Sequence, residues 1–307
     1  MIAEGRFTPP EAWQLLKIVR WLDAGGSGDL ERLNFSHQAS FGLLARLHAD
    51  ALRCRKTCSR STCVYHMARQ RAQEADFVVI NHALLVQTSG EERDTIPKSI
   101  IVDEAHHLAE AARSASRRDF SEEALKEILA SVVRAVQAAA GKELRSQLTR
   151  GSHEALLAWQ AILNELTRLS APARSNRLVL TATERRGSAW QRVQRLATDF
   201  EARVQLVVGL GRGIQLKLTR DERVIWQEAE QQAETFLEQW GVFVTGSEER
   251  LQWLDFKEDY LSKKPMVELF DVARDIREQL KPLFSRQHGV LLTSATLITG
   301  GTFSYIK

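Results

Sequence analysis

The stretch SIIVDEAHHLAEAA, residues 99–112, joins an apolar run to two carboxylates and two histidines. Its first four residues fit a short buried strand, which would put Asp103 and Glu104 at the strand's C-terminal end. Sites that hydrolyse nucleotides present acids in this way, because an aspartate can hold magnesium and a glutamate can activate the attacking water. The simpler alternative is a pair of solvated acids before a helix N-terminus, where negative charge is favoured.

A second candidate site is formed by cysteines. All three cysteines of the chain, Cys54, Cys58 and Cys63, lie in the stretch CRKTCSRSTC. Their spacing differs from the Cys-x2-Cys usual for zinc and suits thiolates around a larger metal cluster. His48 or His66 would be a fourth ligand, although a surface histidine without a metal is the expected state of each.

The segment around these cysteines is basic and has no acid between residues 51 and 71. Four neighbours carry positive charge: Arg53, Arg55, Lys56 and Arg60. Such a field favours thiolates and also attracts a phosphate backbone. A solvated basic helix with incidental cysteines is the alternative.

Composition limits the possible classes of protein. The chain has 307 residues, is 44% apolar and carries a net charge of only +3. It is long enough for substantial cores and is not a polycation. No apolar run approaches the roughly 18 residues of a membrane span. The N-terminus also lacks a signal-peptide pattern, so a cytoplasmic location without membrane contact is expected.

Periodicity predicts the elements that must position these residues. Apolar spacing favours helices over 11–22, 64–76, 122–148, 152–169, 221–240 and 277–285. Strand character is expected at 76–86, 99–103, 242–246, 250–256, 266–273 and 289–297, while 203–219 fits either a helix or a hairpin. Two pieces of α/β character, near 77–108 and 289–307, thus flank a helical block. An insertion between strands of one sheet explains this order.

Three motifs resemble one family of enzymes. IIVDEAHHL resembles motif II of the DEAH-type superfamily 2 helicases, and TSATL (293–297) resembles their motif III. ADFVVINHALL (75–85) resembles the strand and turn that follow the iron–sulfur domain in the DinG/XPD family, and the cysteines precede it. The order of these features follows that family along essentially the whole chain.

The resemblance implies a fold and a domain division. The fold would be α/β, with a partial RecA-like parallel sheet, an inserted helical iron–sulfur domain and a helical arch. Residues 1–74 would be the 4Fe–4S domain and 113–282 the arch. Residues 75–112 and 283–307 would be two segments of the first motor domain.

It also implies an activity, with roles for named residues. The parent protein would be an ATP-dependent 5′–3′ helicase that acts on single-stranded or forked DNA, with a 4Fe–4S cluster, Mg²⁺ and ATP as ligands. Asp103 would bind Mg–ATP, Glu104 would activate water, and His106 would link ATP to the elements that contact DNA. The coupling motif would be Thr293, Ser294, Ala295 and Thr296. The cluster would be held by Cys54, Cys58 and Cys63.

Three features of the family are absent from the sequence: the phosphate-binding loop, a fourth cysteine upstream, and the second motor domain with its arginine finger. A phosphate-binding loop needs glycines, a lysine and a hydroxyl in order. Gly141-Lys142 has Val136 in place of the first glycine and Glu143 in place of the hydroxyl, and GLGRG (209–213) lacks a third glycine. A fourth cysteine upstream is also missing. We therefore expect an internal segment of a helicase that has no ATPase activity by itself.

Other interpretations stay open. A non-catalytic, metal-stapled DNA-binding module derived from a helicase is the main alternative, and a nuclease finds no further acidic constellation to support it. Tryptophans such as Trp159, Trp190, Trp226 and Trp240 are expected in the core. Asn81-His82 is expected to shape the turn near the nucleotide. A set of arginines in the middle block could follow single-stranded DNA or face solvent: 168, 174, 177, 185, 186, 192 and 195.

Overall fold

A computed structural model describes residues 9–26, 28, 30, 33, 63–88, 99–169, 176–258, 265–285 and 289–295. The chain divides into two compact units, residues 1–80 and 81–307, and each is described by itself. The division into four domains stays a prediction. No helix in the described part of the chain is both long and apolar enough to cross a membrane.

The first unit contains two of the expected helices, α1 (Pro9–Asp23) and α4 (Val64–Glu74). Proline suits the first turn of α1, because its missing N–H would have no partner within the helix there. The chain then continues into residues 75–80, which belong to no helix or strand. The strand predicted at 76–86 is therefore wrong.

The remainder of that predicted strand begins the second unit as a helix, α5 (His82–Thr88). Its start has a local cause: the Asn81 side-chain oxygen accepts a hydrogen bond from the backbone N–H of Leu84 at 2.8 Å. This is a helix N-cap, and it overrides the strand preference of the apolar run. Leu85 and Val86 are buried as a result.

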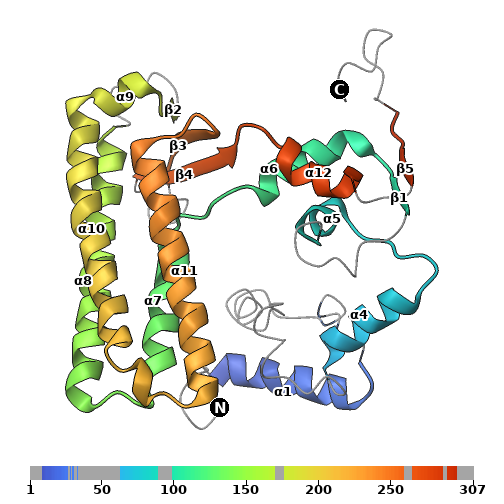
Figure 1. Ribbon diagram of the computed structural model, residues 1–307, viewed down its shortest axis with the longest axis horizontal. Helices are drawn as coiled ribbons and strands as arrows, with labels where there is room; N and C mark the ends of the chain where they lie inside the picture. The colour runs from blue at the N-terminus through green and yellow to red at the C-terminus, as the bar shows by residue number, and fades with distance from the viewer. Residues whose placement is uncertain are drawn as a thin grey trace. The chain divides into compact units, whose positions relative to one another are not determined.

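The functional sheet of the second unit has two parallel strands, β1 (Ser99–Val102) and β5 (Gly289–Leu292). Val102 lies opposite Leu292, so both strands end at the same edge. A small core joins them to α5, α6 (Leu108–Ala115) and α12 (Arg277–Ser285). These elements lie together on the right of Figure 1. The expectation that TSATL and DEAH belong to one sheet is confirmed.

Four long helices form the block between these strands. They are α7 (Glu122–Val136), α8 (Lys142–Arg168), α10 (Ser188–Arg212) and α11 (Arg220–Thr245). Thr219 and Glu222 form a capping box at the start of α11. Residues 203–212, which fitted either a helix or a hairpin, form the last part of α10. A short 3₁₀ turn, Gln215–Lys217, follows. The strand predicted at 242–246 is wrong, because 242–245 complete α11 and bury Phe243.

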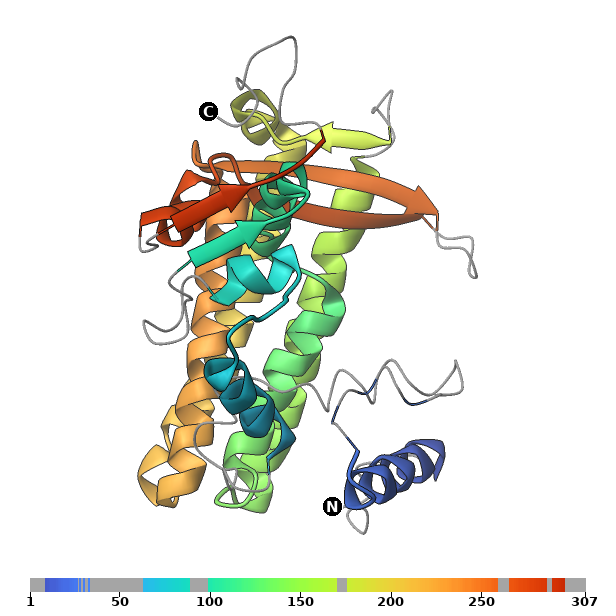
Figure 2. The same ribbon diagram turned by 90° about the vertical axis from the view of Figure 1, so that its right-hand side faces the viewer.

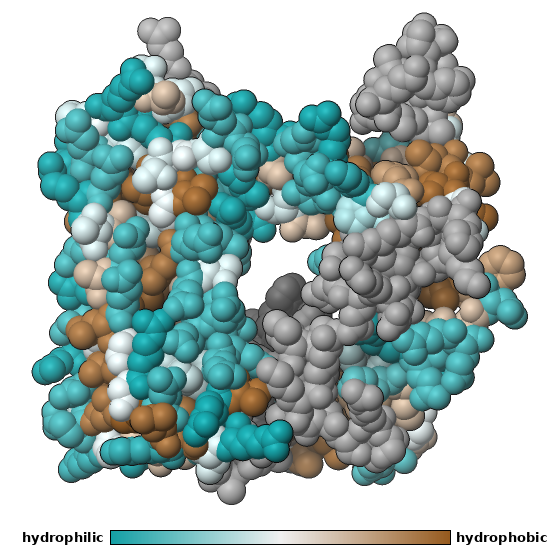
Figure 3. Space-filling view, viewed as in Figure 1, coloured by the Kyte–Doolittle hydropathy of each residue, from teal (hydrophilic) through white to brown (hydrophobic). Residues whose placement is uncertain are grey.

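The core of the block is aromatic. Trp159, Trp190, Trp226 and Trp240 are at most 2% exposed, so the prediction that they are core residues is confirmed. The rings of Trp159 and Trp240 meet edge to face at 4.9 Å. Figure 3 shows that the outer surface of these helices is mostly hydrophilic.

An antiparallel sheet lies across one end of the four helices (Figure 2). Its order is β2 (Arg177–Val179), β3 (Arg250–Glu258) and β4 (Pro265–Ala273). The strands predicted at 250–256 and 266–273 are confirmed. β2 was not predicted, and a short helix, α9 (Ala182–Arg186), follows it.

Candidate functional site

The DEAH and TSAT segments leave the parallel sheet together. Beyond the strands, the N–H of Thr293 donates to the carbonyl of Val102, and the N–H of Ala105 donates to the carbonyl of Thr293, both at 2.9 Å. The two loops therefore continue the ladder of β1 and β5 past the edge of the sheet. This is where ligands bind in open α/β sheets.

Asp103 is fixed in place by three hydrogen bonds. Its Oδ1 accepts from the Thr293 hydroxyl at 2.9 Å and from the N–H of Glu104 at 2.9 Å. Its carbonyl accepts from Nε2 of His82 at 2.8 Å, which requires the proton to be on Nε2. Both hydrogen bonds to the carboxylate are accepted by Oδ1. Among the described residues no group bonds to Oδ2, so this oxygen is suited to bind a water or a magnesium ion.

Glu104 has an unusual backbone conformation. Its φ of 48° and ψ of 46° lie in the left-handed region, and it is the one non-glycine residue with positive φ in the described part of the chain. That region is costly for residues with a Cβ and is concentrated at functional sites. The turn separates β1 from the 3₁₀ helix Ala105–His107 and leaves the Glu104 carboxylate half exposed.

The Glu104 side chain is part of a triangle with His106 and Ser294. The Ser294 hydroxyl donates to Oε2 of Glu104 at 3.3 Å and lies 2.7 Å from Nδ1 of His106. His106 Nδ1 is itself 3.2 Å from Oε2. When Nδ1 carries its proton, His106 donates to Ser294, and Ser294 donates to Glu104. The acid is thus tied through Ser294 to the loop after β5.

Helix α6 connects this loop to the block. Its buried residues Leu108 and Ala112 face the small core. The hydroxyl of Ser116, just after the helix, accepts from the N–H of Ala273 at 3.0 Å, and its carbonyl accepts from Arg250 at 2.8 Å. The helix that begins at the acids is therefore anchored to the antiparallel sheet at its other end.

The structure brings five of the predicted site residues into contact: Asp103, Glu104, His106, Thr293 and Ser294, with Ala295 next to them in the chain. Thr296 lies outside the described residues, as do the predicted cluster ligands Cys54 and Cys58. The same holds for the predicted DNA-binding set, Arg53, Arg55, Lys56 and Arg60.

Cys63 is the one predicted cluster ligand that the structure describes. It is a free, partly exposed thiol at the position before α4, and it makes no capping hydrogen bond there. A thiol so placed is available to a metal, but a single ligand does not define a cluster. No group of three or more His, Cys, Asp or Glu able to hold a metal occurs in the described residues.

The two glycine-containing stretches considered as phosphate loops, Gly141-Lys142 and GLGRG, lie at a helix start and within a helix. Gly141 precedes the first turn of α8. Gly211 of GLGRG lies inside α10, and a Cβ there would come within 2.2 Å of the Trp226 ring. This glycine therefore lets the indole pack against the helix. The expectation that neither is a phosphate loop agrees with these positions.

Most of the middle-block arginines that we considered for DNA are engaged with other protein groups. Arg168 and Arg192 both bind Glu165, at 3.0 and 2.6 Å, and Arg177 binds Asp255. Arg185 donates to the carbonyl of Phe243 and to Gln252. Arg174 lies outside the described residues.

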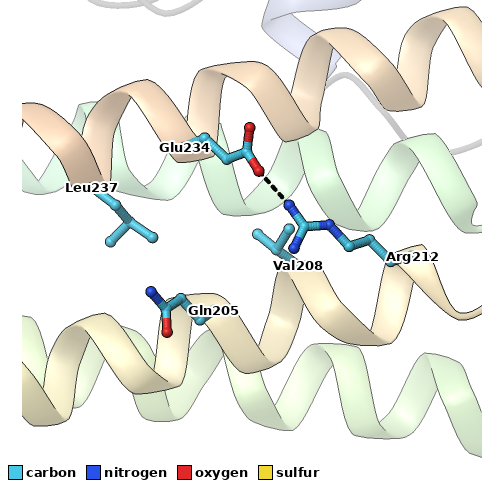
Figure 4. Close-up of a pocket in the computed structure, with 5 residues that line it drawn as sticks. All are labelled: Gln205, Val208, Arg212, Glu234 and Leu237. Carbon is cyan, nitrogen blue, oxygen red and sulfur yellow. Dashed lines mark hydrogen bonds and ion pairs between the residues drawn. The ribbon is translucent and has the colours of Figure 1, made fainter.

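A hollow of about 290 Å³ occurs between α10 and α11, lined by Gln205, Val208, Arg212, Glu234 and Leu237 (Figure 4). Arg212 bridges Glu230 and Glu234 across it. The hydrogen bond to Glu230 raises the pKa of Arg212. Because the charges of this hollow already pair with one another, we assign it no ligand.

Two comparisons with known proteins find similarities over part of the chain. Residues 47–125 match the family model described as DEAD_2. The chain is 32% identical over 99 residues to "3'-5' exonuclease DinG" of Bacillus subtilis (strain 168). That alignment covers 31% of this chain and 10% of the relative. The DEAD_2 match includes Asp103 and Glu104 but ends before the TSAT segment. The chain therefore contains a helicase-related DEAD_2 segment that is similar to a part of DinG.

Proposed function

We propose that this chain is a segment of an ATP-dependent 5′–3′ DNA helicase of the iron–sulfur type, and that it supplies the acids and the coupling loop of the motor. The observation that carries the proposal is the pairing of β1 with β5, which ties Asp103 and Glu104 to Thr293 and Ser294. The similarity to DinG and the DEAD_2 match support it. The partners would be ATP and single-stranded or forked DNA.

In this proposal each residue at the sheet edge has one function. Asp103 holds Mg²⁺, which neutralises the charge that develops on the phosphates. Glu104 accepts a proton from the attacking water. His106 and Ser294 connect Glu104 to the strand β5, so that a change at the phosphate moves the TSAT loop. The left-handed turn at Glu104 follows β1 directly, and the carboxylate lies beside Ser294 and His106.

The phosphate-binding loop would come from polypeptide outside these 307 residues. One face of the parallel sheet supports this. Ile101 and Leu291 lie side by side in the register and are 68% and 56% exposed. Figure 3 shows a hydrophobic area at the upper right, where β1 and β5 lie in Figure 1. The rest of a RecA-like sheet and its helices would cover such a face.

The experiment is a measurement of phosphate release from Mg–ATP, with and without single-stranded DNA. We expect none from the chain alone, because its sequence contains no loop of the G-x-x-x-x-G-K-[ST] type to bind the β- and γ-phosphates. When the chain is joined to, or mixed with, the polypeptide that carries G-x-x-x-x-G-K-[ST], we expect hydrolysis that DNA stimulates. Removal of a catalytic acid typically lowers such a rate by about 10² or more.

Two variants decide the result. Glu104→Gln should abolish hydrolysis. Glu110→Gln, which removes an exposed acid six residues along whose carboxylate lies 3.8 Å from His107, should leave it intact. Hydrolysis that survives Glu104→Gln in the joined protein contradicts the proposal. DNA-stimulated hydrolysis by the chain alone, lost in Glu104→Gln, contradicts only the requirement for a second polypeptide.

The iron–sulfur cluster is a separate part of the proposal. Cys63, with Cys54 and Cys58, would contribute three thiolates, and a fourth ligand would come from elsewhere. A 4Fe–4S cluster gives sulfur-to-iron charge-transfer absorbance in the visible range. Iron and sulfide analysis after anaerobic purification, compared with Cys63→Ser, tests this part independently of ATP hydrolysis.

A further inference from the structure

The outer face of the antiparallel sheet carries an unusual row of side chains. The inner face packs against the helical core through Leu254, Val267 and Leu269. On the opposite face, Val179 of β2 lies opposite Trp253 of β3, and Trp253 lies opposite Phe270 of β4. Trp253 and Phe270 are only partly buried, and Val179 is 56% exposed. Trp253 thus lies at a surface, unlike the four tryptophans in the core of the helical block.

The rings of this row are stacked. Those of Trp253 and Phe270 lie 4.8 Å apart and within 7° of parallel. The guanidinium of Arg177 lies over the far face of Trp253 at 5.2 Å, and that of Arg117 lies 4.2 Å from the centre of Phe270. Four flat groups therefore form one ladder in the order Arg177, Trp253, Phe270, Arg117. Cation–π contacts at each end hold the rings in place.

The two ends of the ladder differ in charge. Arg177 makes two hydrogen bonds with Asp255, at 2.6 and 2.7 Å, and is neutralised. Glu268, the other acid on this face, pairs with Lys257 at 2.7 Å. Arg117 is exposed, and no acid among the described residues pairs with it. Among the described residues of this face, Arg117 is thus the cation without a paired acid, and it lies at one end of the stack.

We propose that this outer face binds single-stranded nucleic acid, with a base stacked on the exposed guanidinium of Arg117. Bases stack on guanidinium planes and on aromatic side chains, and the N–H groups at the rim of a guanidinium bind phosphate. The single side chain of Arg117 can therefore contact both a flat base and a phosphate of a single strand. The exposed apolar residues on this face, Val179 and Leu251, extend the contact to the sugar and a neighbouring base.

This site is distinct from the acids at the parallel sheet. Ladder and acids share no residue, so binding at the ladder goes beyond the proposed hydrolysis. The two proposals can also fail separately. Glu104→Gln should abolish hydrolysis and leave nucleic-acid binding unchanged. Ladder variants should weaken nucleic-acid binding, measured directly, and leave hydrolysis unchanged.

The test measures binding of fluorescent oligothymidine and oligouridine of about 20 nucleotides, by anisotropy at low ionic strength. The variants are Arg117→Ala, Arg117→Lys and Phe270→Leu. Arg150→Ala is the matched control, because it removes an exposed arginine of α8 that lies outside the ladder. We expect Arg117→Ala and Phe270→Leu each to weaken binding about fivefold or more, the fold-change for one lost stacking contact.

The conservative variant separates stacking from charge. Arg117→Lys keeps the cation but loses the flat surface, so it should bind nearly as weakly as Arg117→Ala. Binding of Arg117→Lys equal to that of the parent would overturn the stacking geometry. An equal loss in Arg150→Ala, or equal affinity for duplex DNA, would reduce the effect to general attraction of phosphate and overturn the site. If Phe270→Leu does not fold, the surface variants of Arg117 still decide.

Discussion

At the scale of single residues, Glu104 shows how the site differs from an ordinary strand end. Its left-handed backbone is a conformation that glycine adopts without cost and that other residues avoid. A carboxylate at this position, bonded to Ser294 and close to His106, indicates that its chemistry outweighs the backbone strain.

This interpretation predicts an order of stability among variants of Glu104. Glu104→Gly should be more stable than Glu104→Ala by about 1 kcal/mol, because both lose the carboxylate and only alanine retains the strain. Hydrogen exchange of the backbone amides of β1 and the following turn, measured at increasing urea, gives the difference, because the small core beside Glu104 contains no tryptophan. Equal free energies of opening in the two variants would show that the turn does not require positive φ.

At the scale of elements, the connection between the motif strands and the block depends on one buried acid. Asp271 on β4 is fully buried, contacts Arg118 at 3.5 Å and Arg250 more closely, and accepts from Gln252 at 2.9 Å. Burial and the positive charge of Arg250 lower the pKa of Arg118, and Asp271 opposes this shift. The carboxylate therefore holds two arginines that would otherwise be unpaired.

We accordingly expect Asp271→Asn to lower the free energy of unfolding by about 3–5 kcal/mol, since it leaves buried cations without a counter-charge. The control is Asp275→Asn, which removes an exposed acid four residues along. The Arg277 hydrogen bond lowers the pKa of Asp275 to about 2. Chemical denaturation compares them. Similar small shifts in both variants would mean that the Asp271 pairs do not hold the junction.

Sequence patterns predicted the elements that have strong periodicity. The apolar spacing predicted helical structure over most of α7, α8 and α11, each of which buries one face. It misplaced one boundary, because a helix predicted over 122–148 is broken at 137–141. It did not predict α10, since 203–219 fitted either a helix or a hairpin and 188–202 was not assigned. The errors have local causes: the Asn81 cap turned a strand-like run into α5, and packing of Phe243 extended α11 over VFVT. β2 has only three residues and exists because it pairs with β3.

More of the site than of the fold could be predicted from the sequence. The resemblance to helicase motifs II and III named Asp103, Glu104, His106 and residues 293–296, and the apolar run before each motif predicted that the two strands share a sheet. The hydrogen bonds from Thr293 and Ser294 to the two acids were not predicted. The left-handed turn at Glu104 and the stack of Trp253 on Phe270 were not predictable, since they depend on a backbone angle and on strand register. A pair of aromatic residues on neighbouring predicted strands was the available signal for the stack.

At the scale of the second unit, two hydrophobic cores reflect an insertion. Every buried residue of the large core lies between Phe120 and Leu269. The small core draws on both sides of that range, from Leu85 to Ala112 and again at Leu283. The block can therefore complete its core alone, whereas the parallel sheet needs chain from both flanks.

This arrangement predicts that a polypeptide of residues 116–275 folds by itself. It retains the large core, the antiparallel sheet and the contacts of Ser116 with Ala273 and Arg250. We expect cooperative urea unfolding, as in most single domains of this size, and the blue-shifted fluorescence of buried tryptophans. A polypeptide of residues 1–115 should show no cooperative unfolding of the segment that contains β1, because it lacks β5 and Leu283. Gradual unfolding of the 116–275 polypeptide would mean that the block depends on the sheet that it interrupts.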